Sequence, residues 1–163
     1  MAKIARPYTL LLRILAMAAA ISAAVVMATG RQTTTFFNLT LKAEFSQTPS
    51  FIFFVIAYAI ASLYSLLALF IQPTSLFSRW VGVFDVIISM LMTAAMGAAV
   101  AIAQVGKKGN KHAGWLPICE EVSKYCNQIM GALISGTVGL LLHNIIVFHT
   151  IITRSILFFH ENN

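Results

Sequence analysis

Charged residues are scarce in this chain. They make up 10% of its 163 residues, and 59% of the residues are hydrophobic. A soluble domain usually carries ~25% charged residues. The mean hydropathy of +0.85 agrees with this shortage. An ordinary soluble domain is therefore excluded, and the length leaves room for one membrane bundle without a separate soluble domain.

Residue groups that carry enzyme chemistry are also missing. The sequence has no paired carboxylates, no Gly-rich phosphate loop, no Cys-x-x-Cys and no cluster of metal ligands. Single members of a Ser–His–Asp set are present, but we expect Asp85 and His143 to lie at opposite depths of the membrane. The sequence therefore predicts that the chain is not an enzyme and holds no cofactor and no metal.

Acidic residues are fewer than basic ones, 5 against 11, which gives a formal net charge of +6. The basic residues are scattered over short polar segments and form no patch of the kind that binds nucleic acid. We therefore exclude nucleic acid as a partner. Attraction to the anionic head groups of membrane lipids explains the basic excess.

The sequence does contain long apolar runs, at residues 8–28, 51–71, 81–105 and 129–152. Each is about 20 residues or longer, so a helix with ~1.5 Å rise per residue can cross ~30 Å of hydrocarbon. The runs are continuous rather than alternating and therefore predict helices. The expected fold class is an all-α membrane protein. It is a four-transmembrane-helix bundle with short loops, in a single domain over residues 1–163.

The first apolar run follows basic residues, as the core of a signal peptide does. It is longer than the ~7–15 residues of such a core, and Arg13 interrupts it early. We therefore expect a retained first helix.

Counts of lysine and arginine do not settle the orientation, because five fall on one side of the membrane and six on the other. The flanks of the first run favour a cytoplasmic N-terminus. That orientation also places a glycosylation sequon, Asn38-Leu39-Thr40, outside, together with both cysteines. We expect both termini to be cytoplasmic. The expected outer loops are 29–50 and 106–128, and the expected inner loop is 72–80.

The two cysteines, Cys119 and Cys126, precede the fourth run. On one unbroken helix this spacing separates them by ~10 Å, whereas a disulfide needs Cα atoms closer than ~7 Å. A bonded pair therefore requires the fourth helix to start near or after Cys126. The alternative is two free thiols. His112 alone adds too few ligands for a metal site.

Arg13 and Asp85 are the charges that fall inside the first and third runs. These helices run in the same direction, so both charges reach similar depth and can pair, as intramembrane charges usually do. The pair can fix the register of the two helices. Two alternatives are a role in an ion or proton path, and an Arg13 side chain that reaches the head groups while Asp85 bonds elsewhere.

Other polar and small residues in the runs indicate contacts between helices. His143 and Asn144 lie in the fourth run, where they can bond across helices or line a transport route. Small residues recur at every fourth position, which allows close packing within the bundle or between copies. They are Ala16, Ala20 and Ala24 in the first run, and Gly131, Ser135 and Gly139 in the fourth.

The order of these features resembles one family. The features are Arg13, Asp85, the cysteine pair, and the strings FIFFVIA at 51–57, YSLL at 64–67 and GKKGN at 106–110, with Trp115 and Ile118-Cys119. They resemble the Casparian strip membrane protein-like (CASP-like) proteins of land plants over almost the whole chain, and the compact tails are similar to those of subfamily 1. That family is similar to the MARVEL-domain proteins of animal junctions.

The resemblance implies a multi-pass plasma-membrane protein that self-associates or mixes with relatives. It also carries over Arg13, Asp85, Cys119 and Cys126 as functional residues. Founding members form immobile platforms that recruit lignin-building enzymes to the adjoining wall. They have a characteristic first outer loop, which QTTTFFNLTL at 32–41 does not match. We therefore expect a non-enzymatic scaffold that forms homo-oligomers and hetero-oligomers, contacts membrane lipids and organises wall-modifying enzymes. The alternative is a small ion or solute transporter or channel.

Overall fold

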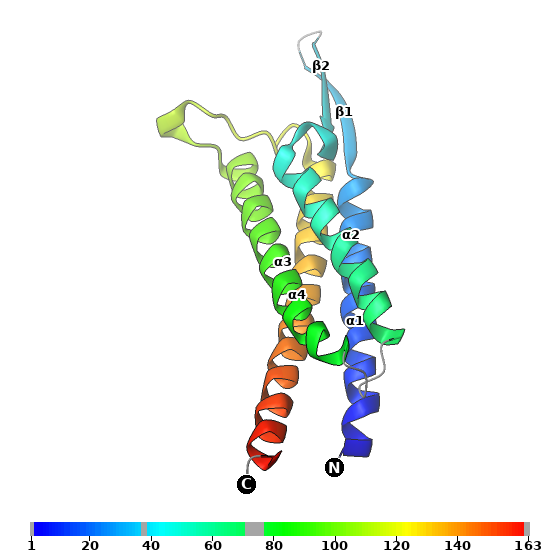
Figure 1. The fold of residues 1–163 in the computed structure, drawn as a ribbon. Coiled ribbons are helices and arrows are strands. Elements are labelled where there is room, and N and C mark those ends of the chain that lie inside the picture. Colours follow the sequence, from blue (N-terminus) through cyan, green and yellow to red (C-terminus); the bar gives the residue numbers. More distant parts are fainter. Residues whose placement is uncertain (1, 37–38, 71–76, 162–163) are drawn as a thin grey trace.

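The chain folds into a bundle of four long helices. The structure, a computed structural model, describes residues 2–36, 39–70 and 77–161. The helices are α1 (Ala2–Ala28), α2 (Pro49–Phe70), α3 (Phe77–Lys108) and α4 (Ser123–Glu161). All four are long and apolar enough to cross a membrane, which confirms the expected fold class. Both chain ends lie at the same end of the bundle (Figure 1).

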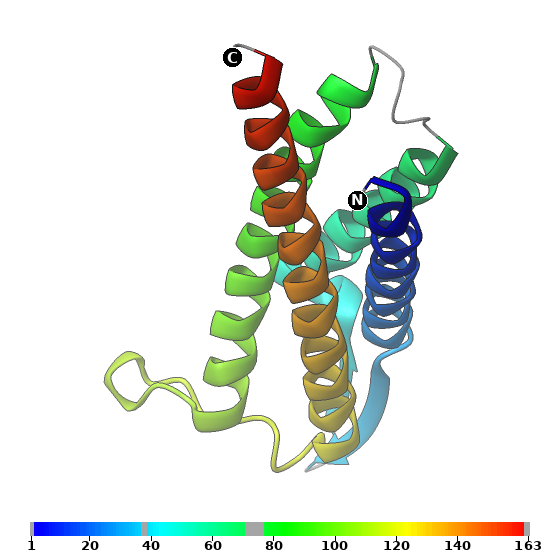
Figure 2. The same ribbon diagram turned by 90° about the horizontal axis from the view of Figure 1, so that it is seen from below.

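The helices follow the order α1, α4, α3, α2 around the bundle, because each of them packs chiefly against its two neighbours in that order. Figure 2 shows α4 between α1 and α3. Helices α1 and α3 therefore face each other diagonally, as do α2 and α4. A side chain that joins one diagonal pair must cross the centre of the bundle.

Three of the helices extend several residues beyond the apolar runs that predict them. Helix α1 begins at Ala2, α3 spans Phe77–Lys108 and α4 spans Ser123–Glu161. An apolar run marks only the part of a helix that fits the hydrocarbon. The backbone bonds of a helix continue into polar flanks until a breaker ends them.

A β-hairpin occupies the first outer loop, where the sequence predicts no regular structure. Strand β1 (Arg31–Phe36) pairs antiparallel with β2 (Leu39–Glu44), with Arg31 opposite Glu44. Three consecutive threonines fall in β1, and β-branched residues favour strands. A short 3₁₀ helix, η1 (Phe45–Gln47), then leads into α2. The sequon residue Asn38 lies outside the described residues.

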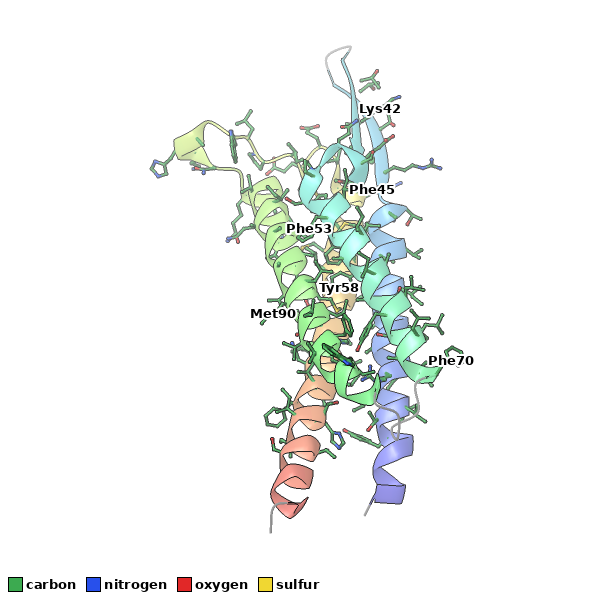
Figure 3. The ribbon with its side chains drawn as sticks, viewed as in Figure 1. Lys42, Phe45, Phe53, Tyr58, Phe70 and Met90 are labelled. Carbon is green, nitrogen blue, oxygen red and sulfur yellow. A yellow bond between two sulfur atoms is a disulfide. The ribbon has the colours of Figure 1, made fainter. Side chains whose placement is uncertain are left out.

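Small and aromatic residues fill much of the core, together with methionines and a few large aliphatic side chains, while many other large apolar side chains face outwards. Phe54 and Tyr58 are fully buried among alanines of all four helices. Phe70 and Met90 point away from the bundle, as Figure 3 shows. This arrangement suits a bundle in lipid, because hydrocarbon does not drive apolar side chains inwards and close packing of small residues holds the helices together.

Candidate functional site

Arg13 of α1 and Asp85 of α3 form an ion pair across the diagonal of the bundle. Arg13 Nη1 donates to Asp85 Oδ1 at 3.1 Å, and Nη2 donates to Oδ2 at 2.6 Å. Asp85 is fully buried and Arg13 is 7% exposed. Two parallel bonds fix the orientation of the guanidinium as well as its position. The structure thus brings together the two charges that the sequence places at similar depth.

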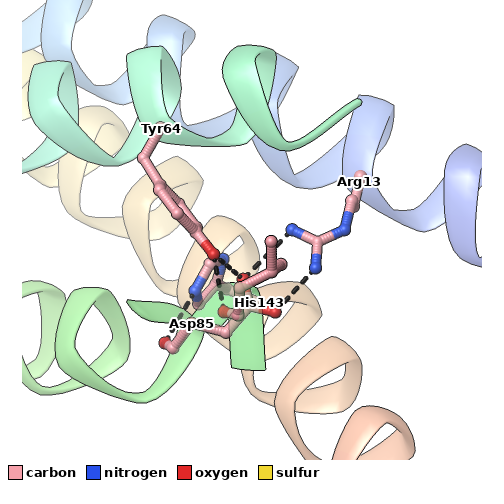
Figure 4. A network of polar contacts seen from close by, with 5 residues as sticks. Arg13, Tyr64, Asp85 and His143 are labelled. Atoms are coloured by element: carbon pink, nitrogen blue, oxygen red, sulfur yellow. Dashed lines mark hydrogen bonds and ion pairs between the residues drawn. The ribbon is translucent and has the colours of Figure 1, made fainter. Parts of the chain in front are cut away.

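Helices α2 and α4 contact the same aspartate (Figure 4). The Tyr64 hydroxyl of α2 donates to Asp85 Oδ1 at 2.7 Å and lies 2.9 Å from the carbonyl oxygen of Val81. His143 Nε2 of α4 lies 3.2 Å from the backbone oxygen of Asp85. All four helices therefore meet at one residue, which lies where the two diagonals of the bundle cross.

The expectation that Asp85 and His143 lie at opposite depths is wrong. Helices α3 and α4 are antiparallel, so depth must be counted from opposite ends of their sequences. Asp85 lies ~35 Å before the end of α3 at Lys108, and His143 lies ~30 Å after the start of α4 at Ser123. Both lie in the half of the bundle that contains the chain ends. Their contact supplies no catalytic set, because His143 contacts the backbone of Asp85 and not its carboxylate.

This four-residue network is closed to solvent. Among the described residues, every buried side-chain nitrogen and oxygen has a hydrogen-bond partner. His143 is 2% exposed, and Tyr64 is partly buried. The carboxylate accepts bonds from two side chains and so has compensation for its charge. This arrangement holds the four helices in one register. Removing Arg13 or Asp85 would leave a buried charge unpaired, whereas Tyr64 and His143 each contribute one contact to the same residue.

Asn144, the neighbour of His143, points to the outside of the bundle. Its Oδ1 accepts a hydrogen bond from the hydroxyl of Ser89 on α3. Ser89 lies ~13 Å from Trp80, where the apolar window of α3 begins, and Asn144 lies ~13 Å from Thr153, where the apolar window of α4 ends. Within the described chain, the exposed amide nitrogen of Asn144 has no hydrogen-bond partner. A primary amide donor is thus exposed on the surface of the bundle, inside the apolar windows that can cross a membrane.

Most of the predicted small residues pack within the bundle. Ala16, Ala20 and Ala24 are buried on α1, and a Cβ added to Gly139 would lie 3.3 Å from the nitrogen of Ala20. Ser135 Oγ lies 2.6 Å from Ser22 Oγ, which adds a polar contact between α1 and α4. The partners of this ladder are therefore α1 and α4 themselves.

Gly131 does not belong to that contact. It is exposed, and a Cβ added to it would meet nothing within 4 Å. Gly136, which the ladder does not include, is packed more tightly. Its added Cβ would lie 2.8 Å from Phe54 Cζ and 2.9 Å from Met96 Cε, and its carbonyl accepts a 3.0 Å bond from Tyr58.

The two cysteines are joined at the other end of the bundle. Cys119 and Cys126 form a disulfide with a Cα–Cα distance of 5.6 Å. Helix α4 begins at Ser123, so Cys119 precedes the helix and Cys126 lies in its first turn. The segment between the cysteines is thus not one straight helix, as a bonded pair requires.

Backbone contacts fix the loop that carries Cys119. The Gly106 carbonyl at the end of α3 accepts bonds from the nitrogens of Ile118 and Cys119, at 2.9 and 3.3 Å. Gly109 turns with a positive φ of 66°, and a Cβ there would lie 2.6 Å from the carbonyl oxygen of Trp115. Glycine is required at that turn.

The first outer loop is attached to α4 beside the disulfide. Gln32 Oε1 of strand β1 accepts a 2.9 Å bond from the backbone nitrogen of Tyr125. Gln128 Nε2 donates to the Val26 carbonyl and to Thr29 Oγ1, both at 3.0 Å. The hairpin and the start of α4 are therefore connected at this end of the bundle.

Comparison with known proteins places these residues in a family. The model of the Casparian strip membrane protein domain matches residues 3–142. The chain is 48% identical over 145 residues to CASP-like protein 1C2 of Vitis vinifera, a match that covers 89% of this chain and 90% of the relative. It is 52% identical over 123 residues to CASP-like protein 1C1 of Sorghum bicolor, covering 76% of each chain. It is 46% identical over 142 residues to CASP-like protein 1C1 of Arabidopsis thaliana, covering 87% of each. No solved structure matches the chain.

Proposed function

The chain belongs to the CASP-like family, in its subfamily 1C, and from that premise we propose that it is a non-enzymatic scaffold of the plasma membrane. In this proposal, copies associate laterally with one another and with related family members. The outer loops then organise enzymes that modify the adjoining cell wall. Both termini are cytoplasmic, and the hairpin and the disulfide loop face the wall.

The positions of the loops and the chain ends support this orientation. The hairpin and the disulfide loop share one end of the bundle, and both chain ends share the other (Figure 1). Disulfides persist outside the cytoplasm, so the end with Cys119–Cys126 suits the outer face. The hairpin and loop are also the largest structures outside the apolar windows at that end, which suits them to contact partners in the wall.

One observation carries the proposal of lateral association, the exposed amide of Asn144. An amide in hydrocarbon without an acceptor is unfavourable, and polar side chains in spans usually bond across helices. An asparagine offers both a donor and an acceptor, so two copies related by a two-fold axis can satisfy each other with this one residue type. Asn144 is bonded on one side only, to Ser89, which leaves its nitrogen available to a second copy.

The test compares Asn144→Leu with Asn144→Gln in tagged full-length protein at native expression. The leucine variant removes the amide, whereas the glutamine variant keeps it. We expect single-molecule photobleaching to show fewer copies per particle for the leucine variant only. Recovery after photobleaching should also be faster for that variant. Equal copy numbers and equal recovery for wild type and Asn144→Leu would reject the amide as the basis of association.

The transporter alternative has less support. Asp85 and His143 are buried, and the buried polar atoms of the described residues all have partners. Such a network offers no free site to a passing ion. Reconstituted protein in liposomes is expected to show no ion flux above empty vesicles. Flux that Asp85→Asn abolishes would overturn the scaffold proposal.

A further inference from the structure

An apolar cavity lies beneath the second outer loop, between α3 and α4. Its volume is about 550 Å³, within the ~300–1,000 Å³ of pockets that hold small ligands. Its walls include Phe51 of α2, Ile102 and Ala103 of α3, and Ile129 and Met130 of α4. These residues belong to the outer ends of the membrane-crossing windows. The cavity is therefore at the level where hydrocarbon meets the head groups.

The loop that covers this cavity carries large apolar side chains. Trp115, Leu116 and Ile118 line the cavity and are 57%, 82% and 51% exposed. The loop extends sideways past the end of α3 rather than away from the bundle along its axis (Figure 1). Exposed apolar residues of this size mark a contact surface, and tryptophan favours the interface of a bilayer. Lys107 and Glu120 also line the cavity, so its lining offers apolar side chains to hydrocarbon and charged side chains to the head groups.

A second hollow, of about 530 Å³, adjoins the first along the last turns of α3. Val105 lines both. The side chains of Lys108, Lys111 and His112 line the second hollow, and no carboxylate is among the described residues that line it. A basic hollow next to an apolar one has the two chemistries of an anionic amphiphile. The basic side chains suit a phosphate, and the apolar walls suit a hydrocarbon chain.

We propose that these adjoining hollows bind one anionic phospholipid of the leaflet at this end of the bundle. Its phosphate lies between Lys108 and Lys111, and one acyl chain lies in the apolar cavity against Ile102, Ile118 and Met130. A water-soluble ligand would leave the apolar rim exposed to solvent. A lipid covers that rim and needs no opening of the loop, because the cavity is at bilayer depth.

The disulfide is part of this site. Cys119 and Cys126 both line the apolar cavity. Their bond and the two hydrogen bonds to the Gly106 carbonyl hold the loop over the cavity. The loop therefore acts as a wall of fixed position, and reduction of the disulfide removes one of its attachments.

The experiment uses purified full-length protein and two probes. Native mass spectrometry after detergent exchange measures which phospholipids stay bound. A phosphatidylglycerol with a photoactivatable group in one acyl chain, placed in nanodiscs with the protein, maps the contact. We expect one retained anionic phospholipid, and labelling concentrated on the peptides that contain Ile102, Ile118 and Met130. Labelling spread evenly over the lipid-facing helices, or the loss of all lipid in detergent, overturns the proposal.

Variants at Gly106 test the apolar cavity. Gly106 lines the cavity, and a Cβ added to it meets Ile118 only at 3.7 Å, so Gly106→Leu fills the cavity without a close contact at Cβ. Its matched control is Gly97→Leu on the same helix, where an added Cβ meets nothing within 4 Å. We expect labelling at Ile118 to be lost in the first variant and kept in the control. Gly106→Ala, with unchanged helical circular dichroism, should show a smaller loss.

The double variant Lys108→Gln with Lys111→Gln tests the basic hollow. Its control is Lys42→Gln, a lysine on the hairpin. We expect the double variant to lose the preference for phosphatidylglycerol over phosphatidylcholine, while acyl-chain labelling continues. Lys42→Gln should keep the preference.

Two results would overturn the proposal. One is equal labelling in Gly106→Leu and wild type, and the other is a crosslink between two copies at Ile118 in place of lipid labelling. The second result would show that another copy covers the cavity.

Discussion

The carboxylate of Asp85 on α3 is held by the guanidinium of Arg13 on α1 through two hydrogen bonds, of 3.1 and 2.6 Å, that cross the centre of the bundle. Because α1 and α3 are diagonal and not adjacent, this pair constrains all four helices at once. Tyr64 and His143, from the other diagonal, contact the same residue. The network therefore joins all four helices at one depth of the bundle, in addition to their close packing.

Asp85→Asn should destabilise the bundle, because it leaves the guanidinium of Arg13 buried without a counter-charge. Loss of one partner of a buried pair typically costs ~3–5 kcal/mol. We expect a lower thermal midpoint in detergent and reduced delivery to the cell surface. The double variant Arg13→Leu with Asp85→Leu removes both charges and should recover a large part of the loss. Wild-type stability and trafficking of Asp85→Asn would contradict the structural role of the pair.

Tyr64→Phe should have a smaller effect in the same direction. It removes one hydrogen bond to a charged group, which is usually worth ~1.5–3 kcal/mol, and keeps the ring. The control is Tyr8→Phe, an exposed tyrosine on α1, which should leave the thermal midpoint unchanged. If Tyr64→Phe is as stable as wild type, the bond to Asp85 Oδ1 contributes nothing to folding.

Two glycines of α4 should respond to the same substitution with opposite sign. Gly136→Ala places a methyl group 2.8 Å from the buried ring of Phe54, and such overpacking costs ~1–3 kcal/mol. Gly131→Ala meets nothing within 4 Å and should stabilise the helix by up to ~1 kcal/mol. Thermal unfolding of both variants in one detergent measures the contrast. Equal shifts would show that the fit around Gly136 is not as tight as the structure indicates.

The sequence predicts the Arg13–Asp85 contact because it offers very few charged residues that could pair inside the membrane. Asp85 is the one acidic residue inside the apolar runs, and the alternating direction of the helices fixes which charges share a depth. Tyr64 carries no such signal, since a tyrosine in an apolar run is equally typical of simple packing. The depth expected for His143 is wrong, although counting from the start of α4 places it beside Asp85. The sequence therefore contains enough information to predict that contact.

Other features depend on geometry that the sequence does not contain. The apolar runs locate the membrane-crossing helices, but not their extension to Ala2 or Glu161, because polar flanks can be helical or irregular. The pattern of a small residue at every fourth position includes Gly139 but not Gly136. The tight packing at Gly136 depends on where the side chain of Phe54 on α2 points, which the sequence does not show. Strand β2 alternates between apolar and polar residues and β1 carries β-branched threonines, but each strand has only 6 residues. These signals are too short to separate a strand from a polar loop.

Replacing both cysteines by serine should loosen the second outer loop and leave the bundle intact. The disulfide closes a short segment, separation 7, whose entropy cost in the unfolded chain is about 2–3 kcal/mol. The ion-pair network is at the opposite end of the bundle and does not involve the loop. We expect faster hydrogen exchange at the amides of Ile118 and Cys126, and unchanged exchange in the middle of α1 and α2. Reduction of the wild type should give the same pattern. If exchange rises equally along all four helices, the disulfide instead stabilises the whole fold, and the loop is not an independent unit.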